Sequence, residues 1–567
     1  MSTIEYLENC EKNYDADCRM LRSIMGPGHY HSAIEPGKTV HHVLGGLGYA
    51  GALLRAGGAD RQERAEEVIA KVLTFQDADP TSRFYGVWPI FREEPLEAMT
   101  VSDCNLADFG GSALVPIIRE HGDVLSPDVL HRIRESLGHA AWGIYRRNIG
   151  PGYTNIAFAG AVVAAAAGEI LDEPRLVDYA QARFRRIIKH REQQGGFNEY
   201  NSPGYATASI RWCEWADRFV HDAGVRKSAE IMHRRLWQDY ADHFHPGTGQ
   251  LAGPQSRAYA DWIPGSAAVF LQTRIGASIV YRGKDDLEAM ARDTAQQAPP
   301  PPCPPDIAQR FLSLPQPEIE LHHRYILRDP EEESVTGTTW LAEDVCLGSI
   351  NRDNLWTQRR PLLGYWRTPD DPAAMFRLRF LRDGVDFASA YACNTQKRNR
   401  ILSLVSLLTH KGNWHEHLDH PAVDGLFDAE DFRVRCEVVS YAAQFNDLGD
   451  GRFELRADPW RAIIHTAPGV FGDREIPWEP GQSEKDDGRH IFVDGICYHG
   501  HRREFQFAEL EKIVIALGIE LLHAEEGPSG EPVRVEESSG TLAASWNAGD
   551  GLALHGPLRA GPHRCSI

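Results

Sequence analysis

The 567-residue chain lacks the features that mark membrane and disulfide-rich secreted proteins. Its ten cysteines are scattered and form no Cys-x-x-Cys pair, which favours a reduced intracellular protein over a disulfide framework. The longest apolar run, residues 156–168, is too short and too rich in alanine to span a bilayer. The first twenty residues are charged and contain no apolar segment typical of a signal peptide. We therefore expect a cytoplasmic protein with no membrane partner.

Positive charge and the common catalytic signatures are also scarce. Lys and Arg total 60 against 80 Asp and Glu, giving a formal net charge of −20. This balance argues against a broad electrostatic grip on nucleic acid, so we expect no nucleic-acid partner. The chain has no nucleophile elbow, Walker loop or HExxH motif, and its glycine pairs at 45–48 and 109–114 do not follow a strand in a βαβ unit. No cofactor is required by these patterns.

What the chain does contain is a soluble, globular composition with a long helical first half. Hydrophobic residues make up 42% and charged residues 25%, and the length favours two or three domains. Apolar residues recur at three- and four-residue spacing in the first 290 residues, between turns rich in Gly, Pro, Asp and Asn. This pattern predicts helices over residues 38–57, 60–76, 105–121, 126–147, 154–171, 173–193, 205–223, 225–244 and 264–282.

The order of these helices predicts how they assemble. Serial antiparallel helical hairpins of this length favour an α/α toroid, an incomplete barrel, over residues 1–295, with the connecting loops gathered at one mouth. A helical solenoid is the alternative, but the chain shows no repeat of fixed period. The proline-rich stretch 296–306 then ends the pattern and predicts an extended linker.

Residues 307–567 carry short strand-like runs separated by turn residues, which predict an antiparallel β-sandwich. The run at 512–522 also fits a helix, because apolar runs of that length are ambiguous. The fold class is therefore predicted as an N-terminal α/α toroid followed by a C-terminal antiparallel β-sandwich. The strands are predicted at 319–327, 376–381, 400–408, 432–439 and 490–499.

Three polar segments stand out from this background. GGFNEYNSPGY at 195–205 combines tyrosines, asparagines and a glutamate around a bend, and it is accompanied by GPGYTN at 150–155 and GPQSRAY at 253–259. Amides and phenols need partners when buried, so these side chains suit a pocket for hydroxyl-rich or carboxylate-bearing ligands. The alternatives are a structural turn at 195–205, a surface arginine at 257 and a simple helix N-cap at Asn155.

The architecture and the order of these segments resemble the chondroitin/alginate/heparinase II/III-type polysaccharide lyases. The resemblance covers most of the chain in architecture, but its motifs cover about thirty residues and match in order more than in identity. It implies that Asn155 neutralises a uronate carboxylate, that Tyr200 or Tyr205 exchanges protons with the sugar, and that Arg257 and Tyr259 assist. The chain departs from several such lyases by carrying Ile156 where they carry a histidine base. The base then remains open between a tyrosine and a histidine elsewhere, namely His41, His42, His410, His415 or His417.

These residue types fit β-elimination from a uronate-containing oligo- or polysaccharide. The C5 proton becomes removable once the neighbouring carboxylate is neutralised, a role that suits Asn155 and Arg257. A phenol near an arginine can supply a phenolate base, and a neutral phenol can protonate the leaving oxygen. We predict that Tyr205 is the general acid and general base, assisted by Tyr200 or Tyr259. A carbon–oxygen lyase is the predicted activity.

Further side chains are assigned to substrate binding or to a metal. Aromatic and polar residues suit contact with sugar rings, although most tryptophans are core residues. His415, His417 and Asp419 alternate and would share one face of a strand, so a structural zinc or calcium site is a candidate there; a solvated polar loop is the alternative. The predicted substrate-binding residues are Asn198, Glu199, Asn201, His42, Trp88, Trp414 and His415.

Two other functions remain open at this point. A glycoside hydrolase would need two carboxylates about 5–10 Å apart, and Glu199 is available together with Asp103, Asp108 or Asp261. A non-catalytic carbohydrate-binding protein would use the same pocket without turnover. Formation of an unsaturated product separates the lyase from both.

Overall fold

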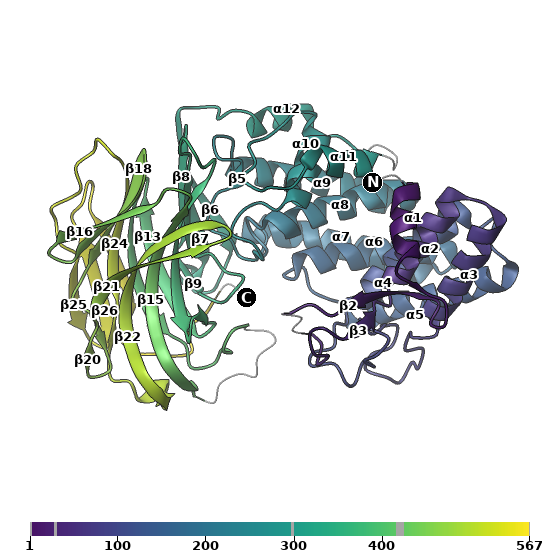
Figure 1. Ribbon diagram of the computed structural model, residues 1–567, viewed down its shortest axis with the longest axis horizontal. Helices are drawn as coiled ribbons and strands as arrows, with labels where there is room; N and C mark the ends of the chain where they lie inside the picture. Colours follow the sequence, from purple (N-terminus) through teal and green to yellow (C-terminus); the bar gives the residue numbers. More distant parts are fainter. Residues whose placement is uncertain (1–2, 28–30, 296–299, 416–423, 566–567) are drawn as a thin grey trace. The chain divides into compact units, whose positions relative to one another are not determined.

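The computed structural model describes residues 3–27, 31–295, 300–415 and 424–565, and it places helices in the first half of the chain and strands in the second (Figure 1). The principal helices begin and end close to the predicted limits. They are α2 (Gly45–Ala56), α3 (Ala59–Leu73), α4 (Leu106–His121), α5 (Pro127–Arg147), α6 (Thr154–Ile170), α7 (Pro174–Gln194), α8 (Pro203–Phe219), α9 (Ala223–His243) and α10 (Gly265–Ile275).

Two predicted helices were too long. Residues 39–41, predicted as helix, form β3 (Thr39–His41) in a small antiparallel sheet with β1 (Tyr14–Asp15) and β2 (Met20–Ile24). At the other end, α10 stops where Gly276 adopts a left-handed φ of 74°. Short helices outside the prediction are α1 (Thr3–Glu11), α11 (Leu287–Ala295) and α12 (Pro305–Ala308).

Helix α6 is buried along nearly its whole length. All its residues except Glu169 are buried, in keeping with a segment that is apolar on every side. Small side chains allow this, because a Cβ atom added at Gly111 of α4 would lie 2.6 Å from Val163. The alanine- and glycine-rich sequence thus permits close approach of α4 and α6.

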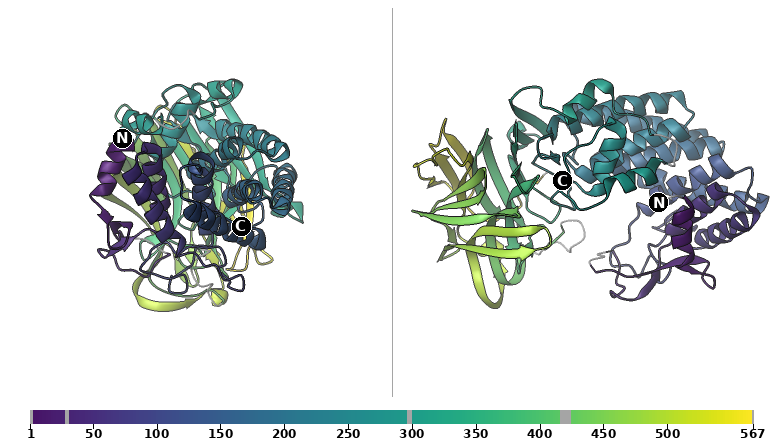
Figure 2. Two further views of the ribbon diagram at one scale, coloured as in Figure 1. Left: turned by 90° about the vertical axis from the view of Figure 1, so that its right-hand side faces the viewer. Right: turned by 45° about the horizontal axis from the view of Figure 1, so that its top comes forward.

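The strands form two large antiparallel sheets and several small ones (Figure 2). The nine-stranded sheet has the order β21 (Trp478–Lys485), β22 (Gly488–Gln506), β15 (Leu426–Ser440), β11 (Ala374–Arg382), β10 (Leu362–Trp366), β8 (Val345–Ile350), β7 (Val335–Ala342) and β6 (Glu318–Ile326), with β12 (Val385–Asp386) beside β11. The seven-stranded sheet has the order β16 (Gln444–Gly449), β17 (Arg452–Ala457), β18 (Trp460–Thr466), β24 (Ala516–His523), β14 (Arg400–Leu407), β13 (Ala390–Lys397) and β9 (Arg352–Asn354).

The small sheets add short strands at several places. They pair β19 (Val470–Phe471) with β20 (Arg474–Glu475) and β23 (Ile513–Val514), β26 (Thr541–Trp546) with β25 (Arg534–Ser538) and β27 (Leu552–Pro557), and β4 (Phe244–His245) with β5 (Gln250–Leu251). The ambiguous run at 512–522 is therefore strand. Its apolar character follows from the position of β24 between β18 and β14, where nearly every residue is buried.

One hydrophobic core joins the two large sheets into a sandwich. Phe376 and Val434 of the nine-stranded sheet share this core with Leu455 and Ile519 of the seven-stranded sheet. Side chains from two inner faces interdigitate in this way in aligned β-sandwiches. The predicted fold class is confirmed: a helical N-terminal region is followed by antiparallel sheets stacked as a sandwich.

The chain divides into two compact units that do not follow chain order. We call Met1–His190, Thr207–Leu236 and Asp286–Pro301 the helical unit. The sheet-rich unit comprises Arg191–Ala206, Trp237–Asp285 and Pro302–Ile567. Two of the three polar segments, 195–205 and 253–259, therefore fall wholly in the sheet-rich unit, whereas 150–155 belongs to the helical unit.

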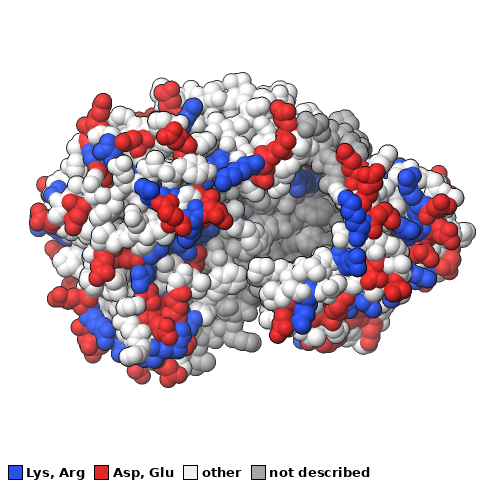
Figure 3. All heavy atoms as spheres, viewed as in Figure 1, with Lys and Arg blue, Asp and Glu red and all other residues white. Residues whose placement is uncertain are grey.

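The described part of the chain can be compared with the expectations about membrane spans, disulfides and charge. None of its helices has both the length and the apolar character needed to cross a bilayer. All ten cysteines lie in this part and none forms a disulfide. On the face drawn in Figure 3, basic and acidic side chains are interspersed, so the excess of negative charge is not gathered in one patch there.

Candidate active site

The backbone of the sheet-rich unit brings two loops together around Arg257. The amide of Gln255 donates to the carbonyl of Arg360, Arg360 donates back, and the amide of Ala258 donates to the carbonyl of Gln358. On the other side, the amide and hydroxyl of Ser256 both donate to the carbonyl of Tyr200 at 3.1 Å. Segment 255–258 is thus held between the loop that precedes α8 and the loop that precedes β10.

The guanidinium of Arg257 is the centre of this arrangement. Its Nε donates to Gln358 Oε1 at 2.7 Å, its Nη2 donates to Tyr205 Oη at 3.0 Å, and its Nη1 lies 3.4 Å from Glu199 Oε1. The Cζ atom also lies 4.6 Å from the centroid of the Tyr205 ring. Arg257 is 7% exposed, so these interactions fix the guanidinium in a largely water-free setting.

Tyr205 and Tyr259 extend this network toward solvent. The hydroxyl of Tyr205 donates to Tyr259 Oη at 2.9 Å, and the two rings are tilted with centroids 5.9 Å apart. Tyr259 is 64% exposed, whereas Tyr205 is half-buried. Donors therefore point outward in series, from Arg257 to Tyr205 and from Tyr205 to Tyr259. An oxygen at the outer end that acquires negative charge is stabilised by the donors behind it.

Burial controls the protonation of Tyr205. It raises the pKa of this phenol above the usual range; Arg257 acts to lower the pKa, and neighbouring Tyr259 acts to raise it. The phenol is therefore protonated at neutral pH in this arrangement. The expectation that an adjacent arginine yields a ready phenolate is not met, because the cost of burying the charged form outweighs the attraction to one guanidinium.

The inner side of the network contains residues that sequence motifs did not single out as a group. Gln358 bridges Arg257 and His415, because its Nε2 atom lies 3.5 Å from His415 Nε2. His415 is buried and meets the Trp356 ring edge-on at a centroid distance of 4.2 Å. The predicted contribution of His415 to the site remains a prediction. In the structure, Gln358 lies between His415 and Arg257. Gln358 belongs to no motif, so only the tertiary bridge reveals it.

The remaining predicted residues of segment 195–205 face several directions. Tyr200 is 3% exposed, donates to Asp353 Oδ2 at 3.0 Å and stacks on Tyr325 with ring centroids 4.1 Å apart. This position corrects its assignment to proton transfer, because burial in a core cluster leaves it no access to a sugar. Asn201, at a left-handed φ of 45°, donates from its amide to the Pro254 carbonyl and to Tyr325 Oη, and Asn198 is half-buried.

Asn155 lies in the first turn of α6 in the helical unit and is 4% exposed. The residue at the cap position is Tyr153, whose side chain makes no capping hydrogen bond, so capping does not account for Asn155. Nearby polar side chains are connected: Asn105 Nδ2 donates to Tyr153 Oη at 3.0 Å, and Arg147 donates to Asn105 Oδ1 at 2.7 Å. The start of α6 is therefore a polar end of an otherwise apolar helix.

The predicted sugar contacts in the helical unit differ in exposure. His42 is exposed, accepts a hydrogen bond at Nδ1 from the Gly45 amide and lies edge-on to Phe91. Trp88 is fully buried, and a Cβ atom added at Gly110 would lie 2.4 Å from its ring. The assignment of Trp88 to sugar stacking is corrected, because its ring fills the core against α4.

Of the three residues predicted to bind zinc or calcium, two lie outside the described part of the chain. His417 and Asp419 lie in 416–423, outside the described part of the chain. The third member, His415, faces Trp356 and Gln358 as described above. Trp414 precedes it, half-buried, with its carbonyl 3.5 Å from the amide of Thr357. The zinc or calcium site in this segment stays a prediction.

The carboxylates considered for hydrolysis are mostly held by arginines. Asp261 accepts from Arg360 at 2.8 Å and from Arg377 at 2.7 Å; burial acts to raise its pKa, but these arginines lower it to about 2. Glu199 lies against Arg257. In the helical unit, burial raises the pKa of Asp108 to about 6 in spite of the nearby Arg147, whereas Asp103 accepts a hydrogen bond from the Asn105 amide.

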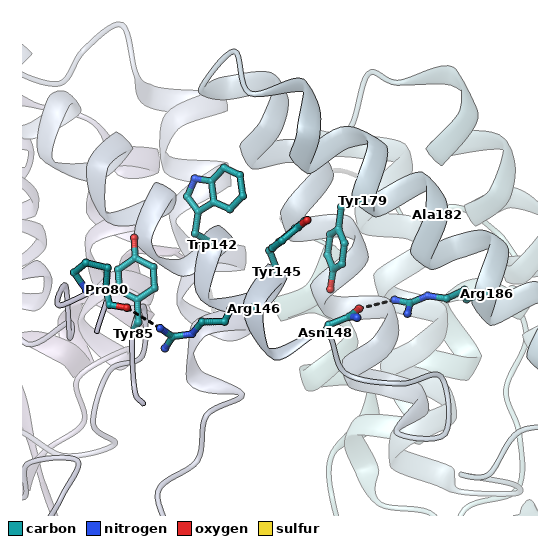
Figure 4. Close-up of a pocket in the computed structure, with 9 residues that line it drawn as sticks. All are labelled: Pro80, Tyr85, Trp142, Tyr145, Arg146, Asn148, Tyr179, Ala182 and Arg186. Carbon is teal, nitrogen blue, oxygen red and sulfur yellow. Dashed lines mark hydrogen bonds between the residues drawn. The ribbon is translucent and has the colours of Figure 1, made fainter. Parts of the chain in front are cut away.

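A separate pocket of about 790 Å³ lies in the helical unit between the C-terminal end of α5 and the central part of α7 (Figure 4). Its walls are aromatic, and its arginines already bind the protein: Arg146 donates to the Pro80 carbonyl and Arg186 to Asn148 Oδ1. Because both arginines already form these hydrogen bonds, the pocket suits acid–base chemistry less well than the Arg257 network does. It is lined by Pro80, Tyr85, Trp142, Tyr145, Arg146, Asn148, Tyr179, Ala182 and Arg186.

Comparisons with known proteins found one family model and several similar solved structures. A family model described as a domain of unknown function, DUF8769, matches residues 7–276. A search of curated proteins found no match. Among solved structures, heparinase III is similar at 9% identity, with a TM-score of 0.45 and coverage of 90% of this chain and 82% of that chain.

Two further solved structures show likeness of the same degree. The heparan sulfate lyase HepC from Pedobacter heparinus is 11% identical, with a TM-score of 0.36 and coverage of 90% and 81% of the two chains. The chondroitin AC lyase from Streptomyces coelicolor A3, in complex with chondroitin sulphate, is 9% identical, with a TM-score of 0.44 and coverage of 99% and 94%. At TM-scores below 0.5 none of these likenesses assigns a function to this chain.

Proposed function

We propose that this protein is a carbon–oxygen lyase that cleaves a uronate-containing oligo- or polysaccharide by β-elimination. The observation that carries the proposal is the outward series of donors from Arg257 through Tyr205 to the exposed Tyr259. Elimination needs a group that takes a proton from carbon and gives one to a leaving oxygen. A pair of hydrogen-bonded phenols, one half-buried and one exposed, can do both without a second reactant.

In the proposed step, the phenol pair both accepts and donates the proton, so no other reactant is needed. The C5–H bond breaks and its proton passes to the pair in its phenolate form, while the electron pair forms the C4=C5 double bond. The C4–O bond breaks, and the leaving oxygen receives the proton from the pair. Tyr259 is the phenol that meets the sugar because it is 64% exposed, and Tyr205 stabilises charge behind it.

Arg257 has a different role in this proposal from the one that its residue type alone indicated. With Nε, Nη1 and Nη2 each held by a neighbour and only 7% of its surface exposed, it orients and polarises Tyr205. We therefore propose Arg257 as a positioning residue. The assignment of Asn155, which belongs to the helical unit, to the uronate carboxylate stays a separate prediction. Amide N–H groups aimed at a carboxylate stabilise the charge that develops on it during proton removal.

The test is ultraviolet absorbance of an unsaturated uronate product during incubation with alginate, glucuronan, hyaluronan, chondroitin, heparan or ulvan. Tyr205→Phe and Tyr259→Phe are each expected to lower kcat/KM about 10²–10⁴-fold, the contribution typical of general acid–base catalysis. Tyr200→Phe is the matched control, because it removes a phenol from the same segment that points into the core. Activity should rise as pH increases above neutrality, since burial raises the pKa of Tyr205 and the base form is scarce at lower pH.

Other outcomes would redirect the assignment. Release of reducing sugar without ultraviolet absorbance would contradict elimination and favour hydrolysis by a pair of carboxylates. Binding without turnover, unchanged in Tyr205→Phe and Tyr259→Phe, would contradict any catalytic role of the phenol pair.

A further inference from the structure

A second cluster of reactive side chains lies at the small N-terminal sheet of the helical unit. Asp15 ends β1, Cys18 lies in the turn to β2, and His41 ends β3. One ligand atom from each lies within 4.8 Å of the others. His41 is buried, whereas Asp15 and Cys18 are partly exposed, so an ion could enter from the side of the turn.

The turn presents the Asp15 carboxylate in a fixed orientation. Its Oδ1 atom accepts the amides of Asp17 and Cys18, each at 3.0 Å, and this closes the turn. The other oxygen, Oδ2, lies 3.3 Å from Nε2 of His41. One carboxylate oxygen therefore builds the loop while the other faces the imidazole.

Glu93 determines which nitrogen of His41 faces Asp15. Its Oε2 accepts the backbone amide of His41 at 2.9 Å and its Oε1 lies 2.7 Å from Nδ1 of the ring. A neutral imidazole donates from one nitrogen only, and a carboxylate at Nδ1 favours the proton there. The lone pair of Nε2 then faces the carboxylate oxygen of Asp15, and two acceptors at 3.3 Å need a proton or a cation between them.

The separation of these atoms fits a metal ion. Ligands at about 2.0–2.1 Å from a tetrahedral zinc ion lie about 3.3 Å apart, which is the distance between Nε2 of His41 and Oδ2 of Asp15. A carboxylate on the other ring nitrogen of a metal-binding histidine, as Glu93 provides, orients the ring and raises its basicity. Two ligand charges, from Asp15 and a Cys18 thiolate, match a dication.

We propose that Asp15, Cys18 and His41 bind a divalent transition-metal ion of the zinc class, with Glu93 holding His41 and a water molecule completing the tetrahedron. Thiolate and imidazole ligands select zinc or its relatives over calcium and magnesium, which prefer oxygen. The ion joins the turn after β1 to the end of β3. This site is independent of the Arg257 network, so neither proposal depends on the other.

The experiment uses the full chain, stripped with a chelator and titrated with Co²⁺ as a spectroscopic probe. We expect one equivalent to produce tetrahedral cobalt bands and a sulfur-to-cobalt charge-transfer band, both removed by Zn²⁺. Cys18→Asp should retain binding but lose the charge-transfer band, because an oxygen replaces the sulfur. Glu93→Gln should weaken Co²⁺ binding about 10–100-fold, as expected for loss of the carboxylate that orients the histidine.

Cys104→Ser is the matched control, since Cys104 is also partly exposed in the helical unit but lies outside the cluster. It should leave the spectrum unchanged. The proposal is overturned if the native chain shows no tetrahedral cobalt spectrum at one equivalent, or if the charge-transfer band survives in Cys18→Asp. Circular dichroism of each variant confirms that a lost band does not reflect unfolding.

Discussion

The helical unit and the sheet-rich unit use polar side chains in different ways. In the helical unit the polar groups near Asn155 lie at the ends of helices, and α6 itself is buried along nearly its whole length. In the sheet-rich unit, by contrast, Glu199, Tyr205, Arg257 and Gln358 form a connected network between loops that are more than fifty residues apart.

This difference follows from how each unit satisfies its backbone. A helix bonds its own N–H and C=O groups, so polar side chains are needed only at its ends. Loops packed against the sandwich must find partners elsewhere, and segment 255–258 finds them in Tyr200, Gln358 and Arg360. The same hydrogen bonds that satisfy the loops also hold Arg257 beside Tyr205. The hydrogen bonds that anchor the loops of the sheet-rich unit thus also position the candidate active site.

Among the substitutions that test this difference between the two units, Arg257→Met is expected to have the largest effect on stability. It leaves the buried carboxylate of Glu199 without its guanidinium and should lower the free energy of unfolding by about 3–5 kcal/mol. In Arg257→Met/Glu199→Gln the buried charge is removed as well, so most of that stability should return. Urea denaturation of both variants measures this recovery.

Activity separates the two roles of Arg257. If it positions Tyr205, both variants should show the same low turnover on the substrate found in the absorbance assay, despite their different stabilities. Turnover that recovers together with stability in the double variant would show that the guanidinium supports only the fold.

Much of the helical unit could be predicted from sequence, because its signals are local. Apolar spacing placed α4, α5 and α6 within one residue of their observed limits. The error at residues 39–41 arose because β3 pairs with β2, a contact between separate segments that apolar periodicity does not record.

The site in the sheet-rich unit could be predicted only in part. The composition of 195–205 pointed to the correct segment, but it could not show that Tyr200 turns inward while Tyr205 turns outward. That choice depends on Tyr325 and Asp353, which lie more than a hundred residues away and provide the stacking and hydrogen-bond partners of Tyr200. Gln358 was missed for the same reason.

A smaller effect, in the helical unit, is expected from Asp108→Asn. Burial raises the folded-state pKa of Asp108 from 3.8 to about 6, so the native state binds this proton more tightly than the unfolded state does. Its contribution to stability is therefore present below pH ~3.8 and is lost as pH rises through ~6. One pKa unit corresponds to about 1.4 kcal/mol, so the loss is about 3 kcal/mol.

The measurement is the free energy of unfolding of the native chain and of Asp108→Asn at about pH 4 and pH 7. Because the unfolded-state carboxyl is already partly ionised at pH 4, the native chain should lose about 2 kcal/mol more than the variant between these values. Comparing two pH values cancels the constant cost of removing the partner of Arg147, which lies 3.1 Å from Asp108. An equal pH dependence in both chains would contradict a raised pKa at this position.

The smallest effect is expected from Tyr200→Phe, which tests the contrast within one loop. The substitution removes the hydrogen bond to Asp353 but keeps the ring that stacks on Tyr325, and Asp353 retains Arg359 at 3.3 Å. A loss of about 1 kcal/mol in the free energy of unfolding follows, the usual net value of one hydrogen bond. Turnover should stay within about twofold of the native value, in contrast to the 10²–10⁴-fold loss expected for Tyr205→Phe. Similar losses of turnover in both variants would place Tyr200 in the chemistry and erase the distinction between the inward and outward phenols.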